Sequence, residues 1–179
     1  MANTSPARIW AMRAAFPALA LLIMFFHLLP LNTEPRFWAP PDFLLLLAIT
    51  WSQRRPDFVP ALSIALVMLL ADLLFHRPPG LLALLTVLAC EFLKARAAPH
   101  RESTFVSEWL AAGVTLIGMA VLNRLVLVVF GVAQAPLSLT VIQIVMTIAA
   151  YPLAVWVSQA ILGVRKLSPS EAETLMSRR

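Results

Sequence analysis

The chain has 179 residues, of which 60% are hydrophobic and 13% are charged. Soluble domains carry about 25% charged residues, and the charges here lie between long apolar blocks, so the composition excludes an ordinary soluble domain and is typical of a multi-pass membrane protein. The net charge of +5 accompanies no nucleic-acid-binding motif, and basic residues in cytoplasmic loops account for it. The single cysteine, Cys90, excludes an intramolecular disulfide and a thiolate metal cluster, and we expect it to be a small packing residue.

The first apolar segment, 14–31, follows two arginines, Arg8 and Arg13. It is longer than the apolar region of a secretory signal peptide, and the Leu-Asn-Thr-Glu-Pro sequence at its end is a poor cleavage site. We therefore interpret it as an uncleaved transmembrane helix that follows a cytoplasmic N-terminus, residues 1–13.

Five further apolar segments follow, at 43–51, 59–75, 79–92, 106–132 and 137–164. A bilayer core of about 30 Å needs about 20 helical residues, so 59–75 and the last two segments predict spans. The segments at 43–51 and 79–92 are short, in the range of re-entrant or partly buried helices. The sequence thus predicts an all-α membrane protein with one transmembrane domain, 14–164, containing about six helices, two of them short, and a cytoplasmic tail, 165–179.

The distribution of basic residues favours six crossings over four. If all six segments cross and the N-terminus is cytoplasmic, eleven of the fourteen basic residues lie on the cytoplasmic side, all but Arg36, Arg77 and Arg124. If the two short segments dip in and return, Arg54 and Arg55 move outside, Arg77 moves inside, and ten remain. Both topologies place both termini in the cytoplasm. Five tryptophans lie near predicted helix ends, as interfacial anchors do: Trp10, Trp38, Trp51, Trp109 and Trp156.

Asp72 and Arg124 fall inside predicted spans, each in the outer half of its helix. An ionised Asp at a helix centre costs about 2.5–3.5 kcal/mol, so Asp72 is expected to face protein or water, to pair, or to take a proton. Arg124 is its natural partner, and an Asp72–Arg124 pair would lock two helices together. The alternatives are a direct functional site at this place and an unpaired Arg124 that reaches the outer headgroups.

The last apolar segment carries a polar stripe with the spacing of one helical face. Its members are Thr140, Gln143, Thr147, Ala150, Ala154 and Ser158. Hydroxyl and amide side chains in membranes hydrogen-bond across helices, so we interpret the stripe as a helix-packing surface. The alternative is the lining of a cavity.

The sequence favours a non-enzymatic protein without cofactor or metal. The three histidines lie on different segments and lack metal-ligand spacing. No nucleophile sits beside a base, and no glycine-rich phosphate loop is present in the sequence. An intramembrane enzyme acting on lipid would need a second acid or base near Asp72, and Asp42 is the only candidate on an outward-facing helix end. The basic turn at 52–57 and the Glu91–Lys94 pair predict contact with headgroups or with a cytoplasmic partner.

Several short motifs, in order along the chain, resemble those of the rod shape-determining protein MreD family. They are Trp51, Arg55-Pro56-Asp57-Phe58-Val59-Pro60, Asp72-Leu73-Leu74, Pro78-Pro79-Gly80-Leu81 and Ala83-Leu84. Glu108-Trp109 resembles the form in alphaproteobacterial members. The resemblance is firm over 41–92 and looser over 93–132. The chain departs from the family in having no glycine in 67–71, and in having His76-Arg77 where a glycine often precedes the proline.

The resemblance implies a non-catalytic, multi-pass inner-membrane scaffold of the cell-elongation machinery, needed for rod shape and organised peptidoglycan synthesis. It implies MreC as a partner, with the MreB filament, RodA and its class B penicillin-binding protein as further contacts. It also implies a similarity in architecture to the six-helix substrate-binding subunits of vitamin transporters. The residues carried over as motif or partner-packing positions are Trp51, Arg55, Pro56, Pro60, Asp72, Pro79 and Gly80.

A different function stays open, that of a substrate-binding subunit of a small-molecule uptake transporter. It predicts a closed pocket with converging polar groups near the outer surface. Asp72 and Arg124 would then contact the ligand instead of each other.

Overall fold

The computed structural model describes residues 6–29, 38–96 and 104–164, and these form helices and turns without any strand. The α-helices are α1 (Pro6–Leu28), α2 (Phe43–Arg54), α3 (Ala61–Leu74), α4 (Leu81–Arg96), α5 (Phe105–Val129) and α6 (Leu137–Leu162), with one 3-10 turn, η1 (Pro56–Phe58). The predicted all-α fold is confirmed. The predicted tail, 165–179, lies outside the described residues, as does His100. Helix α1 begins inside the predicted N-terminal segment.

Three helices in the described part of the chain are long and apolar enough to cross a membrane: α1, α5 and α6. The sequence also predicted a span at 59–75, but α3 has 14 residues. Its start is fixed by Pro60, whose φ of −62° and ψ of 148° are extended. Its end is fixed by a turn in which His76 takes a positive φ of 54°. Helix α4, in contrast, continues to Arg96, past the predicted end.

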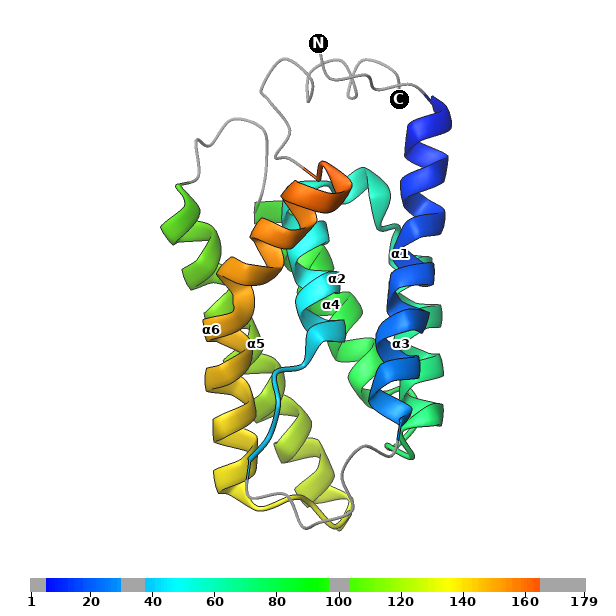
Figure 1. Ribbon diagram of the computed structural model, residues 1–179. Helices are drawn as coiled ribbons and strands as arrows, with labels where there is room; N and C mark the ends of the chain where they lie inside the picture. Colours follow the sequence, from blue (N-terminus) through cyan, green and yellow to red (C-terminus); the bar gives the residue numbers. More distant parts are fainter. Residues whose placement is uncertain (1–5, 30–37, 97–103, 165–179) are drawn as a thin grey trace.

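Helix ends alternate between two ends of the molecule (Figure 1). At the first, which we call the Arg54 end, the starts of α1, α3 and α5 meet the ends of α2, α4 and α6. Arg54 of α2 forms an ion pair of 3.1 Å with Glu108 of α5. The guanidinium of Arg8 donates to the carbonyl of Gly163 at 3.4 Å, and Lys94 donates to the carbonyl of Val59.

The remaining helix ends meet at the Arg77 end. Arg77, between α3 and α4, lies 3.9 Å from the carboxylate of Asp42, which precedes α2. Arg124 near the end of α5 donates to Thr140 near the start of α6. Each helix therefore runs antiparallel to the next along the chain.

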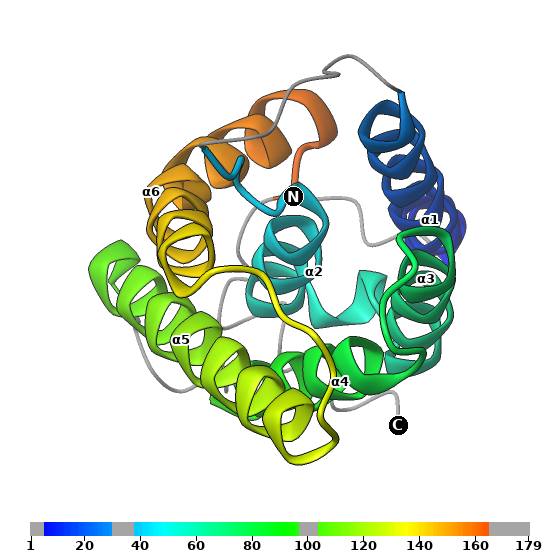
Figure 2. The ribbon, with the colours of Figure 1, turned by 90° about the horizontal axis from the view of Figure 1, so that it is seen from below.

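Helix α2 lies at the centre of the ring formed by the other five helices (Figure 2). Nine of its twelve residues are buried, including three polar ones at its end, Ser52, Gln53 and Arg54. At its start, Oδ1 of Asp42 caps the helix by accepting from the N–H of Leu45 at 3.1 Å. An enclosed helix need not match the bilayer thickness, since its ends contact protein.

The five tryptophans differ in exposure, and Trp109 is intermediate, with its indole N–H donating to the carbonyl of Ile148 at 2.9 Å. Trp10, Trp38 and Trp156 are exposed, at 67%, 54% and 65% of their surface. Trp51 is fully buried, and its indole N–H donates to the hydroxyl of Ser158 at 3.2 Å. The prediction of an interfacial role is therefore wrong for Trp51, because α2 is surrounded by protein and not by lipid. Cys90 is also fully buried, as a packing residue should be.

Candidate functional site

Asp72, at the end of α3, binds the start of α4. Its Oδ2 accepts hydrogen bonds from the N–H groups of Gly80 at 3.1 Å and Ala83 at 3.2 Å, and the residue is fully buried. The first N–H groups of a helix have no partner within it, so an acid placed there satisfies them and interacts favourably with the helix dipole. Gly80 has a φ of +88°, a conformation that favours glycine and brings its N–H to the carboxylate.

The structure does not join Asp72 to Arg124. The guanidinium Nη1 of Arg124 donates to the carbonyl of Ala135 and to the hydroxyl of Thr140, both at 3.2 Å. Each side chain thus bonds to the turn that follows its own helix. The predicted ion pair is absent because both charged groups satisfy local backbone or hydroxyl groups instead.

The polar residues of the α6 stripe make contacts in two regions of the structure. Thr147 accepts from the N–H of Asp42 at 3.0 Å, and Ser158 accepts from Trp51, so these two residues connect α6 to the central segment. Thr140 and Gln143 line a cavity at the Arg77 end.

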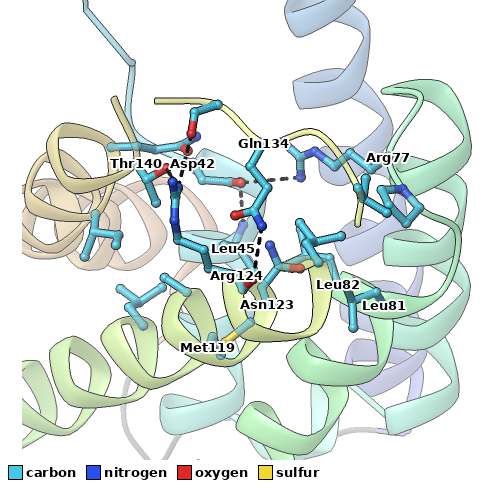
Figure 3. Close-up of a pocket in the computed structure, with 18 of the residues that line it drawn as sticks. Asp42, Leu45, Arg77, Leu81, Leu82, Met119, Asn123, Arg124, Gln134 and Thr140 are labelled. Atoms are coloured by element: carbon cyan, nitrogen blue, oxygen red, sulfur yellow. Dashed lines mark hydrogen bonds and ion pairs between the residues drawn. The ribbon is translucent and has the colours of Figure 1, made fainter. Parts of the chain in front are cut away.

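This cavity, which we call the Arg77-end cavity, has a volume of about 460 Å³ (Figure 3). It lies between α2, α4, α5 and α6 and is bordered by the two turns at 75–80 and 130–136. Its polar lining includes Asp42, His76, Arg77, Asn123, Arg124 and Gln134. Its apolar lining includes Leu45, Leu81, Leu82, Leu116, Met119 and Ile144. Asp72 is not part of the lining.

The polar groups of the cavity are connected. Asp42 engages both of its oxygens, one with the N–H of Leu45 and the other with Arg77. The side chain of Gln134 donates to the carbonyl of Arg124 at 3.2 Å, which ties the 130–136 turn to α5. These contacts bring an acid, two arginines and several amides together from four separate parts of the sequence.

A second polar cluster, the Arg54 cluster, is buried at the other end. It consists of Gln53, Arg54, Glu108 and Tyr151. The hydroxyl of Tyr151 donates to Oε1 of Gln53 at 2.6 Å, and the amide of Gln53 donates to the carbonyl of Glu108 at 3.4 Å. The Arg54–Glu108 ion pair completes the cluster, with both side chains less than 10% exposed. This network of hydrogen bonds and one ion pair connects α2, α5 and α6 in the interior.

The basic turn at 52–57 was predicted to contact headgroups or a partner, and this is wrong for its two arginines. Arg54 and Arg55 are only 6% and 7% exposed. Arg55 ends α2 by donating its N–H to the carbonyl of Trp51 at 2.8 Å, and its guanidinium lies 4.4 Å from the ring centre of Phe58. The turn is buried because the following residues fold back against α1. The Glu91–Lys94 pair is confirmed at 2.8 Å.

The motif prolines shape the turns between these helices. Pro56 opens η1, and the carbonyl of Pro60 accepts the N–H groups of Ser63 and Ile64 at the start of α3. Pro79 is exposed in the turn before α4. Together with Gly80, it leads the chain from α3 into α4.

Sequence reasoning missed the two clusters as sites. Tyr151 is the only tyrosine of the chain, and a lone tyrosine in a long apolar helix suggests a buried hydrogen bond. Arg77 and Gln134 lie in turns, where the sequence gives no sign that they converge. Within the described ranges, no group of three or more His, Cys, Asp or Glu residues could hold a metal ion.

The chain was compared with protein-family models, with curated proteins and with solved structures, and none of the three comparisons finds a match. The function is therefore argued from the residues and their geometry.

Proposed function

We propose that the chain is a non-catalytic, six-span scaffold of the bacterial inner membrane, needed for rod shape and organised peptidoglycan synthesis. The observation that carries the proposal is the ordered set of motif residues over 51–84, which resembles the MreD family. In the fold these residues build the central helix and the α3–α4 hairpin. Asp72 caps a helix, Trp51 packs in the interior, and the prolines shape turns. These are the roles expected of a packing framework.

Six crossings are supported by contacts between helix ends. If the short helices dipped in and returned, Arg54 would lie outside and Glu108 inside, yet the two form an ion pair. Helix α2 measures about 18 Å at 1.5 Å per residue, short of a bilayer core of about 30 Å. Its central position accounts for this shortness, since protein and not lipid surrounds its ends.

The mechanism that we propose is packing of a partner's transmembrane helix, with MreC as the first partner. Helix α3 offers the surface: Leu66 and Leu73, which lie seven residues apart on one helical face, are 59% and 58% exposed. The small residues Ala61 and Ala65 lie on another face of the helix, with Met68 and Asp72. Asp72, Pro79 and Gly80 shape the end of this helix. The MreB filament and RodA with its class B penicillin-binding protein would join through the complex.

Depletion of the protein in its native cell tests the proposal. We expect depleted cells to lose rod shape, and we expect MreC to stop co-purifying with RodA and its class B penicillin-binding protein. Both should recover when the intact chain is supplied. A chain with residues 54–84 replaced by an unrelated hydrophobic hairpin should reach the membrane without restoring shape. Normal shape and normal MreC association under depletion would contradict the proposal.

A second function, a substrate-binding subunit of an uptake transporter, is favoured by one observation, the Arg77-end cavity with its converging polar groups. It predicts a different set of co-purifying proteins. An ATPase and its membrane coupling subunit, captured in place of MreC, would favour transport over scaffolding.

A further inference from the structure

We infer that the Arg77-end cavity binds a monoanionic amphiphile: one carboxylate or phosphate group joined to an apolar body. The inference does not depend on the scaffold function. It rests on the size of the cavity, on its division into an apolar and a polar part, and on the charge of Arg124, which forms no ion pair with an acid of the described residues.

The size and lining fit a small organic molecule. A volume of about 460 Å³ lies within the range of ligand pockets, about 300–1,000 Å³. Leu81 and Leu82 lie on one side of the cavity, whereas Thr140 and the guanidinium of Arg124 lie on the other (Figure 3). A molecule with one apolar and one polar end matches this division.

The charge selects an anion. Asp42 uses one oxygen to cap α2 and the other to pair with Arg77, so this acid is already neutralised. Within the described part of the chain, Arg124 donates to a carbonyl and a hydroxyl, both neutral, and both bonds come from Nη1. Among the described residues, its Nε and Nη2 donate no hydrogen bond. A guanidinium edge of this kind is suited to bidentate binding of a carboxylate or a phosphate.

The position of Arg124 makes this charge effective. Its two bonds anchor it to the 130–136 turn and to α6, so the guanidinium is held before a ligand arrives and little side-chain freedom is lost on binding. The partly buried setting strengthens its interaction with an anion relative to bulk water. A neutral molecule of the same shape would fill the apolar part and gain nothing from Arg124.

The experiment uses the full chain in nanodiscs of phosphatidylcholine alone and two probes, 4-phenylbutyrate and its neutral counterpart 4-phenylbutanol. Isothermal titration should give saturable binding of the acid, with a Kd lower than that of the alcohol by about tenfold or more, as one charge-assisted hydrogen bond provides. Arg124→Gln should raise the Kd of the acid by about tenfold and leave that of the alcohol unchanged. Arg96→Gln, the same charge change on an exposed residue at the Arg54 end, is the matched control and should change neither.

A second variant distinguishes the loss of the Arg124 charge from a change in the shape of the cavity. Ala120→Leu keeps all charges and fills part of the cavity, so it should weaken both probes while Arg124→Gln weakens only the acid. The melting temperature of each variant is measured alongside. No saturable binding of the acid to the native chain, or equal Kd values for acid and alcohol, would overturn the inference unless the lipid result below supports it.

Native mass spectrometry distinguishes the two sources of such an anion. Protein extracted from the membrane that retains an anionic phospholipid, and loses it in both Arg124→Gln and Ala120→Leu, would identify a lipid as the occupant. Binding of 4-phenylbutyrate without a retained phospholipid would identify a soluble acid. Failure of both arms would show that the cavity does not select anions.

Discussion

Asp72 holds two helices in register without forming an ion pair. Its Oδ2 accepts two N–H groups at the start of α4, whereas Oδ1 is buried without a hydrogen-bond partner. Because Oδ2 bonds to Gly80 in the turn and to Ala83 in α4, Asp72 adds a polar connection to the packing of α3 against α4. A buried acid used in this way contributes to packing and needs no chemistry of its own.

Replacing Asp72 tests this role through stability. Asp72→Ala leaves the N–H groups of Gly80 and Ala83 without a partner in a buried site, which should lower the free energy of unfolding by about 1–3 kcal/mol. Asp72→Asn keeps one acceptor oxygen and should lower it less. Thermal unfolding in detergent is monitored as the loss of the monodisperse peak in size-exclusion chromatography. It ranks the stabilities of the native chain, Asp72→Asn and Asp72→Ala.

Glu91→Ala is the matched control for Asp72→Ala. Glu91 is an acid on an exposed surface, and its pair with Lys94 spans one helical turn. Such pairs contribute about 0.5 kcal/mol or less, so the melting temperature should hardly change. If Asp72→Asn and Asp72→Ala lower the free energy of unfolding equally, the result would contradict a capping role. It would favour a role that requires the ionised acid.

The sequence could predict that Asp72 must be satisfied, because an unsatisfied acid among apolar residues is costly. It could not predict which groups would bond to the carboxylate. Arg124 lies at a similar depth in another predicted span, so the pair was a reasonable hypothesis. The actual partners are backbone N–H groups, which every residue except proline carries, and only the turn at Gly80 brings two of them to the carboxylate.

At the scale of elements, the number and order of the α-helices could be predicted, whereas the lengths of α3 and α4 and the placement of the helices could not. The short segments at 43–51 and 79–92 correspond to α2 and α4. An apolar helix surrounded by protein has the same composition as one surrounded by lipid, so the pattern gave no sign that α2 is central. The one available signal was the polar end of α2, Ser52-Gln53-Arg54, which is buried in the fold.

Accessibility of the α3–α4 turn tests whether α2 and α4 cross the membrane. In a Cys90→Ala background, Pro78→Cys should react with a membrane-impermeant maleimide added to the outer face, because six crossings place this exposed turn outside. The dip-and-return topology places it in the cytoplasm. Labelling in spheroplasts, read as a mass shift on a gel, measures the difference.

Two further positions control for leakage and for reagent access. Ser138→Cys, exposed at the start of α6, should be labelled from outside in both topologies. Ser107→Cys, exposed at the start of α5, should be protected in both. If Pro78→Cys is protected like Ser107→Cys, six crossings are excluded.

At the scale of the whole molecule, the two ends differ in how their polar groups are packed. The Arg54 cluster is fully enclosed and fixes α2 against α5 and α6. The Arg77-end cavity keeps open space among its polar groups. The Arg54 end is therefore closely packed, whereas the Arg77 end has room for the ligand that we propose.

The region that resembles the MreD family, 41–92, coincides with α2, α3 and α4 in the fold. Its motifs occupy the centre and the turns, which explains how short sequences spread over about 50 residues form one structural unit. The clusters depend on residues from outside this region, such as Glu108, Arg124 and Tyr151. Their convergence requires the tertiary arrangement and could not be predicted from spacing along the chain.

Partner capture in living cells tests the scaffold function most directly. A photo-reactive benzoylphenylalanine in place of Leu73, exposed on α3 beside Asp72, is compared with the same residue in place of Val114, exposed on α5. These two helices lie on different sides of the ring (Figure 2). Both variants should first be shown to restore rod shape. We predict that irradiation captures MreC at position 73 and not at position 114; capture of transporter subunits at position 73, or of no protein there, would contradict the scaffold function.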